Sequence, residues 1–296
     1  MDFERTKFEY IQKSSKKFSK ITEENKKELL EEIEKYNFSK IIDEIIKSII
    51  ESKFDFRDVN AIILILSELN QIYEKFDVKY SDALKKHIAE FNESLKFPPK
   101  NEDDEERRNT RRKNLLRLQI ESYLYGLFND FGIIRDLFVS LISPKNPKDQ
   151  FLQDFPVLVN LMKIFGESLF GIKSKSVKKL IEIGEIEIYE LSSMIPKNQM
   201  EKYYSGFKDY YYKLVLVYLE EENKNLSEME KKNYENMKKL DSNNEINQAY
   251  QKQRAFYIKY INLINEFAEI MNFDVPDMAN EKIFRYEEQK KNEMVI

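Results

Sequence analysis

The residues of this sequence best suited to binding chemistry are cations clustered near position 110. The cluster consists of Arg107, Arg108, Arg111, Arg112, Lys113 and Arg117. Guanidinium groups present several donors in a planar fork that matches phosphate oxygens, and cations on a loop can follow a nucleic-acid backbone. The cluster therefore predicts contact with RNA or another phosphate. An acidic run, Glu102 to Glu106, directly precedes it, so neutralisation within the segment is the favoured alternative.

A second, weaker group of cations follows later in the chain, at Lys173, Lys175, Lys178 and Lys179. It is a further candidate for phosphate contact. The consecutive tyrosines 210 to 212 suggest base stacking, but aromatic residues at helical spacing more often pack inside a protein. The net charge of the whole chain is only -4, so any affinity for nucleic acid has to come from these local patches.

The sequence offers little material for catalysis. His87 is the only histidine and there is no cysteine, which removes histidine-based acid and base pairs, thiolate nucleophiles and multi-histidine metal sites. No glycine-rich loop that could cradle phosphates is present. The 53 acidic residues are expected on solvated helix faces. We therefore expect no enzymatic activity, no cofactor and no metal, and we expect His87 to be a surface or groove residue.

One pair of charges stands at a helical spacing beside apolar residues. Arg117 and Glu121 are one turn apart and adjoin Leu116, Ile120 and Leu124. An exposed pair of this kind contributes only a few tenths of a kcal/mol, about 0.3 to 0.5. A partly buried pair would instead align adjacent helices. In both cases a structural role is favoured over binding.

The elements that must position these residues are helices. Apolar periodicity predicts helices at about 4–18, 23–36, 39–53, 58–76, 81–94, 113–129, 131–142, 155–170 and 176–191. Helix starts are indicated by Ser39, by Ser81 and by Asp154 before Pro156. Residues 181–191 also alternate like a strand, although no partner sheet is evident. Between 97 and 113 no apolar residue follows Pro99, which predicts a flexible loop.

Two adjacent helical patterns between residues 37 and 76 are the most informative part of the chain. Isoleucines recur in pairs every four residues and form an apolar stripe that includes Ile45 and Ile46. The following segment is apolar on all sides from Ala61 to Leu66, which is typical of a helix with several neighbours. The turn between them is short, so the two helices are expected to pack antiparallel inside a larger helical stack.

The last third of the chain predicts a long helical hairpin at 197–271. Between 197 and 240 only Gly206 could interrupt a helix, and a turn follows at 241–244. The returning segment has a coiled-coil spacing. Its expected seam is Ile246, Tyr250, Gln253, Tyr257, Tyr260, Ile264, Phe267 and Met271, facing Phe207, Tyr211, Leu214 and Tyr218. The outgoing helix turns polar after Leu219, so only the base of the hairpin is expected to be core.

Four segments carry a family resemblance. They are 37–60, 114–128, 203–240 and 273–278, beginning with NFSKIIDEIIK, NLLRLQIESYL, YYSGFKDYYYK and FDVPDM. Their order and spacing resemble the middle domain of eukaryotic initiation factor four gamma, in the version that opens the up-frameshift factor two proteins of nonsense-mediated decay. The likeness runs from about residue 20 to 278, with 144–196 agreeing in helical pattern only. The resemblance implies structural roles for Ile45, Ile46, Asp58, Asn60, Arg117, Glu121 and Gly126.

The expected fold is thus all-α, a HEAT-like stack of antiparallel helix pairs that ends in the hairpin. The expected organisation is an N-terminal extension at 1–20, a middle domain at 21–280 and a charged tail or linker at 281–296. The resemblance implies a non-catalytic scaffold of mRNA surveillance. Up-frameshift factors one and three would bind other parts of a longer protein, and RNA or the surveillance kinase complex could contact this part. The alternative is an RNA-binding helical repeat of the translation initiation or cap-binding machinery.

Composition adds expectations about where the chain acts. A chain without cysteine suits a reducing compartment, so cytoplasm is expected, with a perinuclear position or shuttling to the nucleus as alternatives. The charged start lacks a signal core, and no apolar run approaches the roughly 18 residues that span a bilayer. We therefore expect neither secretion nor membrane insertion, and a monomer.

Overall fold

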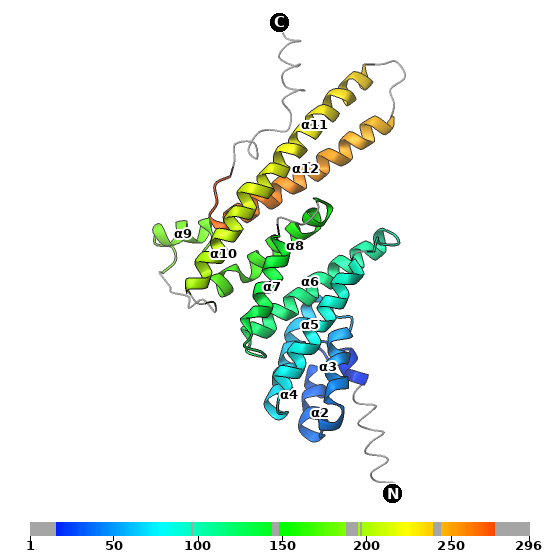
Figure 1. The fold of residues 1–296 in the computed structure, drawn as a ribbon, viewed down its shortest axis with the longest axis vertical. Helices are drawn as coiled ribbons and strands as arrows, with labels where there is room; N and C mark the ends of the chain where they lie inside the picture. Colours follow the sequence, from blue (N-terminus) through cyan, green and yellow to red (C-terminus); the bar gives the residue numbers. More distant parts are fainter. Residues whose placement is uncertain are drawn as a thin grey trace. The chain divides into compact units, whose positions relative to one another are not determined.

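A computed structural model describes residues 16–95, 97–143, 148–187, 195, 197–238 and 244–275. Within these ranges the regular elements are helices and no strand occurs, which confirms the all-α prediction (Figure 1). The chain divides into two compact units, with the division between Phe138 and Val139. The predicted helix at 4–18 lies mostly outside the described residues, and the predicted tail at 281–296 lies entirely outside them.

Unit 1 is built from α2 (Lys26–Lys35), α3 (Ile42–Glu51), α4 (Val59–Ile72), α5 (Phe76–Leu95) and α6 (Glu102–Leu124), and α7 (Phe131–Leu141) begins in it. Ile45 and Ile46 are 0% and 2% exposed, so the isoleucine stripe is core as predicted. The apolar centre of α4 is buried as well, apart from Leu64. Helices α3 and α4 thus share one hydrophobic core.

We expected α3 and α4 to be each other's closest neighbours in an antiparallel pair, and this expectation was wrong. The main contacts join helices two apart in the sequence: α2 with α4, α3 with α5, and α4 with α6. A 3₁₀ turn, Phe56–Asp58, lies between α3 and α4. Alternate helices therefore form the layers of unit 1, and both layers enclose the same apolar interior.

The flexible loop predicted at 97–113 is also wrong, because α6 begins at Glu102. Asn101 caps this helix: its side-chain oxygen accepts the backbone N–H of Asp104 at 2.8 Å. Acidic residues in the first turn interact favourably with the positive end of the helix dipole. Arg108, one turn later, pairs with Asp104 at 2.9 Å. The basic cluster is therefore presented on a helix.

Unit 2 contains α8 (Lys148–Phe170), α9 (Lys175–Glu182), α10 (Lys197–Tyr210), a π-helical segment (Tyr211–Val215), α11 (Leu216–Met237) and α12 (Asn244–Met271). Residues 197–237 follow as one uninterrupted helical run, which confirms the predicted rod. Helix α12 returns alongside α11, as Figure 1 shows in orange and yellow. Of the turn predicted at 241–244, residues 241–243 lie outside the described ranges, and residue 244 begins α12. Helix α8 packs on α12 and completes the core of this unit.

The π segment changes the seam of the hairpin. Phe207 and Tyr211 are buried as predicted, but Val215 and Leu219 follow them in the core, and the predicted Leu214 and Tyr218 are only half-buried. A π turn accommodates one extra residue, so every side chain after it moves around the helix axis. On α12 the predicted seam is buried except at Gln253, which is half-buried, and at the exposed Ile246.

Ser39 begins a 3₁₀ turn that leads directly into α3, so a helical run starts there as expected, although its side chain does not cap it. The expected starts at Ser81 and Asp154 are not observed, since Ser81 lies inside α5. Helix α8 starts at Lys148 and contains Pro156. The strand alternative at 181–191 is not supported in its described part, since α9 ends at Glu182 and a turn with Gly184 at φ +77° follows. Residues 188–191 lie outside the described ranges.

Candidate functional site: a groove in unit 1

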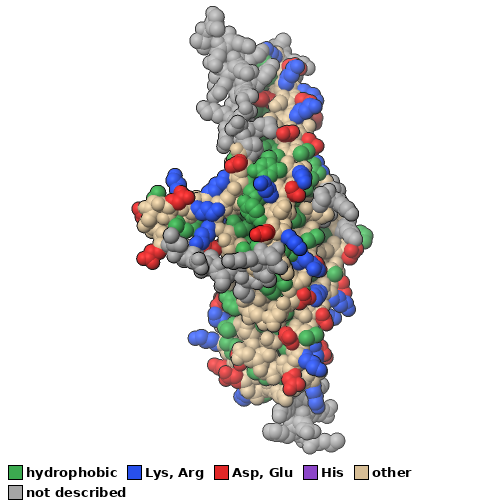
Figure 2. Space-filling model, turned by 60° about the vertical axis from the view of Figure 1, so that its left-hand side comes forward, with side chains coloured by type: hydrophobic (Ala, Val, Ile, Leu, Met, Phe, Trp, Pro, Cys, Tyr) green, Lys and Arg blue, Asp and Glu red, His purple; other side chains and the backbone are tan. Residues whose placement is uncertain are grey.

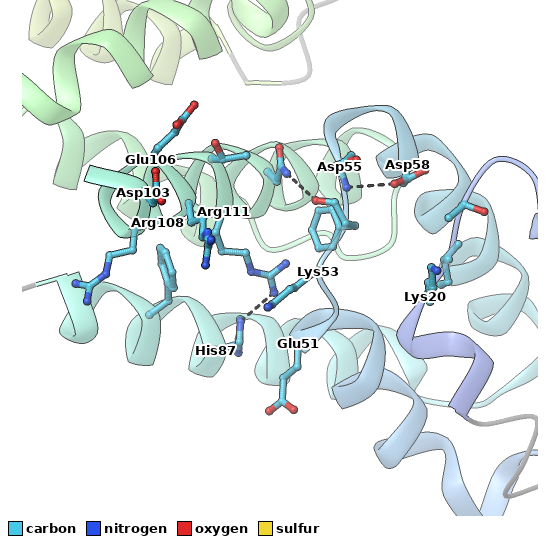
Figure 3. A pocket seen from close by; sticks show the side chains of 17 residues that line it. Lys20, Glu51, Lys53, Asp55, Asp58, His87, Asp103, Glu106, Arg108 and Arg111 are labelled. Atoms are coloured by element: carbon cyan, nitrogen blue, oxygen red, sulfur yellow. Dashed lines mark hydrogen bonds between the residues drawn. The ribbon is translucent and has the colours of Figure 1, made fainter. Parts of the chain in front are cut away.

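A concave surface in unit 1 is called here the unit 1 groove (Figure 3). Its volume is about 910 Å³. The segment after α3 forms one side, α5 forms a second, the N-terminal half of α6 forms a third, and residues 20–22 lie at one end. Its apolar surface comes from Ile21, Phe54 and Phe91. Its cations are Lys20, Lys53, Arg107, Arg108 and Arg111, together with His87.

Three side chains of α6 fasten the segment that follows α3. Arg111 donates to the backbone carbonyls of Ile50 and Ser52, and its guanidinium lies 4.9 Å from the centre of the Phe54 ring. Asn114, one turn later, donates to the Phe54 carbonyl at 2.7 Å. These carbonyls at the end of α3 lack partners within that helix, so the α6 side chains satisfy them.

Arg117 continues this row and confirms the partly buried ion pair. Its Nε donates to the Glu121 carboxylate at 2.5 Å, and the two side chains are 12% and 7% exposed. The same guanidinium donates to the Phe56 carbonyl at 2.8 Å and lies 3.6 Å from the centre of the Phe56 ring. The pair thus joins α6 to the turn before α4, which is the structural role that the sequence favoured.

The remaining cations of the cluster differ in exposure. Arg108 donates to the Phe97 carbonyl at 2.9 Å and pairs with Asp104, so the segment before α6 and its first turns use this charge. Arg112 is half-buried. Arg107 and Lys113 are exposed. The neutralisation of basic by acidic residues that was expected within 102–113 is therefore observed for Asp104 and Arg108. Contact with RNA stays a prediction, and the exposed Arg107 and Lys113 are the residues that could make it directly.

At the centre of the groove, His87 on α5 faces Arg111. Their nearest nitrogens, His87 Nε2 and Arg111 Nη2, are 3.4 Å apart. Burial lowers the pKa of His87, and the nearby Arg111 charge lowers it further, against the opposing charges of Glu51 and Glu90. Burial also lowers the pKa of Arg111 to about 10. His87 is thus the groove residue that the sequence allowed, and it is kept largely neutral at pH 7.

Four acidic residues of the groove belong to the turn before α4 and to the start of α6, and Glu51 at the end of α3 also lines it. Asp55 and Asp58 belong to the turn before α4, where the Asp58 carboxylate accepts the backbone N–H of Asp55 at 3.2 Å. Asp103 and Glu106 are exposed on the first turns of α6. Over the visible face of the molecule, positive and negative side chains are likewise interspersed (Figure 2). The groove is consequently not a single-sign basic surface of the kind that nucleic-acid backbones favour.

The other residues assigned structural roles fit them unevenly. Asp58 stabilises the turn before α4 as described. Asn60 is exposed in the first turn of α4. Gly126 follows α6 with φ +71°, a conformation that favours glycine, and its N–H donates to the Tyr123 carbonyl at 3.0 Å. Gly126 therefore ends α6 and lets the chain turn toward α7.

The second basic patch is divided between structure and solvent. Lys175 donates to the Phe273 carbonyl, and the Lys173 carbonyl accepts from Asn272 at 2.8 Å. Glu269 accepts the Ser176 N–H at 2.6 Å, and hydrogen bonding to the side chain and then to the backbone of Ser176 lowers the pKa of this carboxylate. The start of α9 is thus held to the end of α12, whereas Lys178 and Lys179 are exposed.

Among the described residues no group of three or more histidine, cysteine, aspartate or glutamate side chains is placed to hold a metal ion. Tyr80, whose hydroxyl lies 2.8 Å from that of Ser122, is fully buried, and burial raises its pKa. Such a hydroxyl serves packing. In the part of the chain that the structure describes, no single helix is long and apolar enough to cross a membrane. The bent pair of 151–170 and α9 passes by length and composition alone.

Sequence reasoning missed Lys53, Phe54 and Asn114 as groove residues and mistook Arg111 for a free cation. A signal for Asn114 was present, since it stands three residues from both Arg111 and Arg117 on one helix face. That signal became readable only once 102–113 was recognised as helical. Nothing local in the sequence indicates that this face meets the end of α3.

Comparison with known proteins finds similarity to proteins named as regulators of nonsense transcripts. No protein-family model matches the sequence. It is 26% identical over 275 residues to the regulator of nonsense transcripts UPF2 of Arabidopsis thaliana, covering 90% of this chain and 22% of that protein. It is 24% identical over 271 residues to each regulator of nonsense transcripts 2 of Mus musculus and Homo sapiens, covering 90% of this chain and 20% of theirs. The chain therefore spans about a fifth of the length of these relatives.

Solved structures agree with this similarity. The first MIF4G domain of the human nonsense-mediated decay factor UPF2 superposes with a TM-score of 0.76 at 20% identity, covering 90% of this chain and 83% of that one. The N-terminal MIF4G domain of Saccharomyces cerevisiae Upf2 superposes with a TM-score of 0.64 at 17% identity, covering 90% and 88%. The chain therefore has the all-α MIF4G fold, and its resemblance to the first such domain of UPF2 is confirmed in sequence and in structure.

Proposed function

We propose that the chain is a non-catalytic scaffold domain of a nonsense-mediated mRNA decay factor. The observation that carries the proposal is similarity along 90% of the chain, in sequence and in fold, to proteins named as regulators of nonsense transcripts or nonsense-mediated decay factors. The partners would be other surveillance proteins. Up-frameshift factors one and three would bind other parts of the longer protein, which would act in the cytoplasm or shuttle to the nucleus.

The chemistry of the groove supports a scaffold more than an enzyme. Its best-placed cation, Arg111, donates to backbone carbonyls, and Arg108 is paired with a carboxylate. The only histidine is next to a cation rather than beside a nucleophile or a carboxylate that could orient it. Side chains used in this way hold helices together, and a rigid helical stack offers an extended surface to other proteins.

A reporter assay tests the proposal in cells that make this protein. We expect deletion of residues 16–275 to lengthen several-fold the half-life of a reporter mRNA with a premature stop codon, while a matched reporter without that codon keeps its half-life. Immunoblotting of the remaining protein controls for loss of the whole chain. Equal half-lives of the premature-stop reporter with and without the segment would contradict the proposal. A general fall in cap-dependent translation of both reporters would favour the alternative role in translation initiation.

A further inference from the structure

Three basic side chains from three different elements line the unit 1 groove near its middle. Figure 3 shows Lys53, His87 and Arg111 directed toward one another, while the carboxylate of Glu51 points away from them. His87 comes from α5, Arg111 from α6 and Lys53 from the segment after α3. The 3.4 Å separation of His87 and Arg111 fixes the centre of this group.

The positive charge at this centre is only weakly compensated. The hydrogen bonds of Arg111 go to neutral backbone carbonyls, and Lys53 is exposed beside it. Glu51, which also lines the groove, acts through its charge on both His87 and Arg111, and Glu90 acts on His87 in the same way. Glu51 also lies within 3.8 Å of Lys47. The contacts that fasten the segment after α3 come from Arg111, Asn114 and Arg117, so that structural role does not require Lys53 or His87. An anionic group would be attracted here by Coulomb forces and by charge-assisted hydrogen bonds.

The surroundings of the centre indicate what kind of molecule carries that anion. Ile21 and Phe54 are buried core residues with edges on the groove, and Phe91 adds an aromatic surface. Four carboxylates from the turn before α4 and the start of α6 line the groove as well: Asp55, Asp58, Asp103 and Glu106. A nucleic-acid backbone carries an anion at every residue and would be repelled by these carboxylates. A peptide can instead place one anion at the centre, apolar side chains beside it and cations next to the carboxylates.

We propose that the unit 1 groove binds a segment of a partner protein with one phosphorylated serine, whose three acceptor oxygens suit several donors, flanked by apolar and then basic residues. The anion lies between Lys53, His87 and Arg111, and the basic residues pair with these four carboxylates. The cavity of about 910 Å³ is large enough for several side chains of an extended peptide. The inference deepens the scaffold role, on which it rests, by assigning it a site and a ligand chemistry.

The experiment exploits the fact that His87 is the only histidine in the chain. The purified chain is titrated with three synthetic peptides that share apolar neighbours and a lysine near each end, and that carry phosphoserine, glutamate or serine at the centre. Imidazole signals in NMR spectra follow the pKa of His87 during each titration. We expect the phosphoserine peptide to bind more tightly than the glutamate peptide and to raise this pKa, because a bound anion stabilises the imidazolium. The serine peptide should bind at least tenfold more weakly.

A matched pair of variants locates the binding. Lys53→Gln should weaken binding of the phosphoserine peptide by about tenfold, since it removes one charge-assisted contact. Lys86→Gln removes the same charge one residue from His87, but Lys86 is 78% exposed and lies outside the groove lining. It should change the affinity by less than about twofold. Both residues are exposed, so neither substitution should impair folding, which circular dichroism checks.

Clear results would overturn the inference. These are an unchanged His87 pKa at millimolar peptide, equal affinities for the three peptides, or equal effects of the two variants. If a single-stranded RNA raised the pKa of His87 and its binding required Lys53, while no peptide did either, RNA rather than a peptide would be the ligand of the groove. The reporter assay does not depend on these measurements, so failure of the peptide site and failure of the scaffold role are separately visible.

Discussion

At the scale of single residues, the arginines of α6 show how one side-chain type serves different purposes within a few positions. Arg111 and Arg117 each place a guanidinium over a phenylalanine ring and donate to backbone carbonyls of the segment between α3 and α4. Arg107, on another part of the same helix, is exposed. A cation in the sequence is therefore only a candidate for binding a partner. The structure shows whether its hydrogen bonds already go to groups of the protein itself.

Ile45 is the residue on which the core of unit 1 can be tested most directly. It is 0% exposed, so Ile45→Ala should lower the free energy of unfolding by about 2 to 5 kcal/mol through lost burial and a cavity. Leu64→Ala removes a similar volume from α4, where the side chain is 44% exposed. This control should cost about 1 kcal/mol or less. Urea unfolding measures both, and equal costs would show that the isoleucine stripe is not core.

His87 should make the stability of the chain depend on pH. Its folded-state pKa lies below the ordinary value of 6.5, so the unfolded chain binds the proton more readily. Stability should therefore be fully present above pH 6.5 and fall as the pH drops toward the folded-state pKa. His87→Asn should remove this part of the pH dependence. Urea unfolding at pH 7.5 and 5.5 gives the free energy of unfolding of both proteins. An identical change in this free energy between the two pH values would contradict the prediction.

At the scale of elements, α6 forms where composition alone suggested a loop. Helix stability here comes from the ends and from charge spacing: Asn101 caps, acidic residues occupy the first turn and Asp104 pairs with Arg108. The Asp104 carboxylate also accepts the Lys100 N–H at 3.0 Å, which lowers its pKa. Local polar contacts thus offset the absence of an apolar face at the start of this helix.

The cap of α6 has a measurable consequence. Asn101→Ala should destabilise the first turn of α6 by about 1 kcal/mol, because the Asp104 N–H loses its acceptor. Hydrogen exchange at the Asp104 amide should become faster. Asn92→Ala is the control, since Asn92 is exposed within α5 and alanine suits a helix interior. It should leave exchange in α6 unchanged, and an equal change in both variants would rule out a specific cap.

The π segment of the hairpin provides a second test at this scale. Its Val215 carbonyl accepts the hydroxyl of the buried Tyr260 at 3.1 Å, and burial raises the pKa of that tyrosine. Tyr260→Phe removes the donor without changing the ring, so it should cost about 0.5 to 1.5 kcal/mol in thermal or urea unfolding. Tyr212→Phe, at a position 38% exposed, should cost less than about 0.5 kcal/mol. If Tyr260→Phe were neutral, the π segment would not depend on this bond.

At the scale of the whole molecule, two units each enclose their own apolar interior without cysteine, and within the described residues no metal-binding group was found. Helix packing and hydrogen bonds stabilise each unit. Burial of aromatic residues is prominent in unit 2, where Phe155 lies within 5.7 Å, centre to centre, of both Tyr260 and Phe267. Such pairs add to the stabilisation from burial itself.

This composition predicts insensitivity to chelators. The melting temperature of the purified chain should change by less than about 1 °C in EDTA, because a bound ion that stabilises the folded state would make it depend on metal. The same preparation should show no ATP turnover above that of a mock purification. A lower melting temperature in EDTA that zinc or magnesium restores would disprove the first expectation, and turnover that persists through repurification would disprove the second.

The sequence alone determined the helical class, most helix positions, the isoleucine core and the long hairpin. Each of these follows from apolar residues repeating at the period of a helix, which is a local property. Even the family resemblance depended on residues close together in four segments. Local patterns were misleading where no apolar face exists, at the start of α6, and where one extra residue shifts the helix, at Tyr211–Val215.

Only the tertiary structure decided what the arginines do. Arg111 meets carbonyls 59 and 61 residues away in the sequence, and Asn114 meets one 60 residues away. Whether a cation finds such partners depends on which helices pack side by side, and here alternate helices do. The convergence of Lys53, His87 and Arg111 likewise requires three elements to meet. Long-range packing therefore selects, from the many charges that the sequence provides, the few that remain available for a partner.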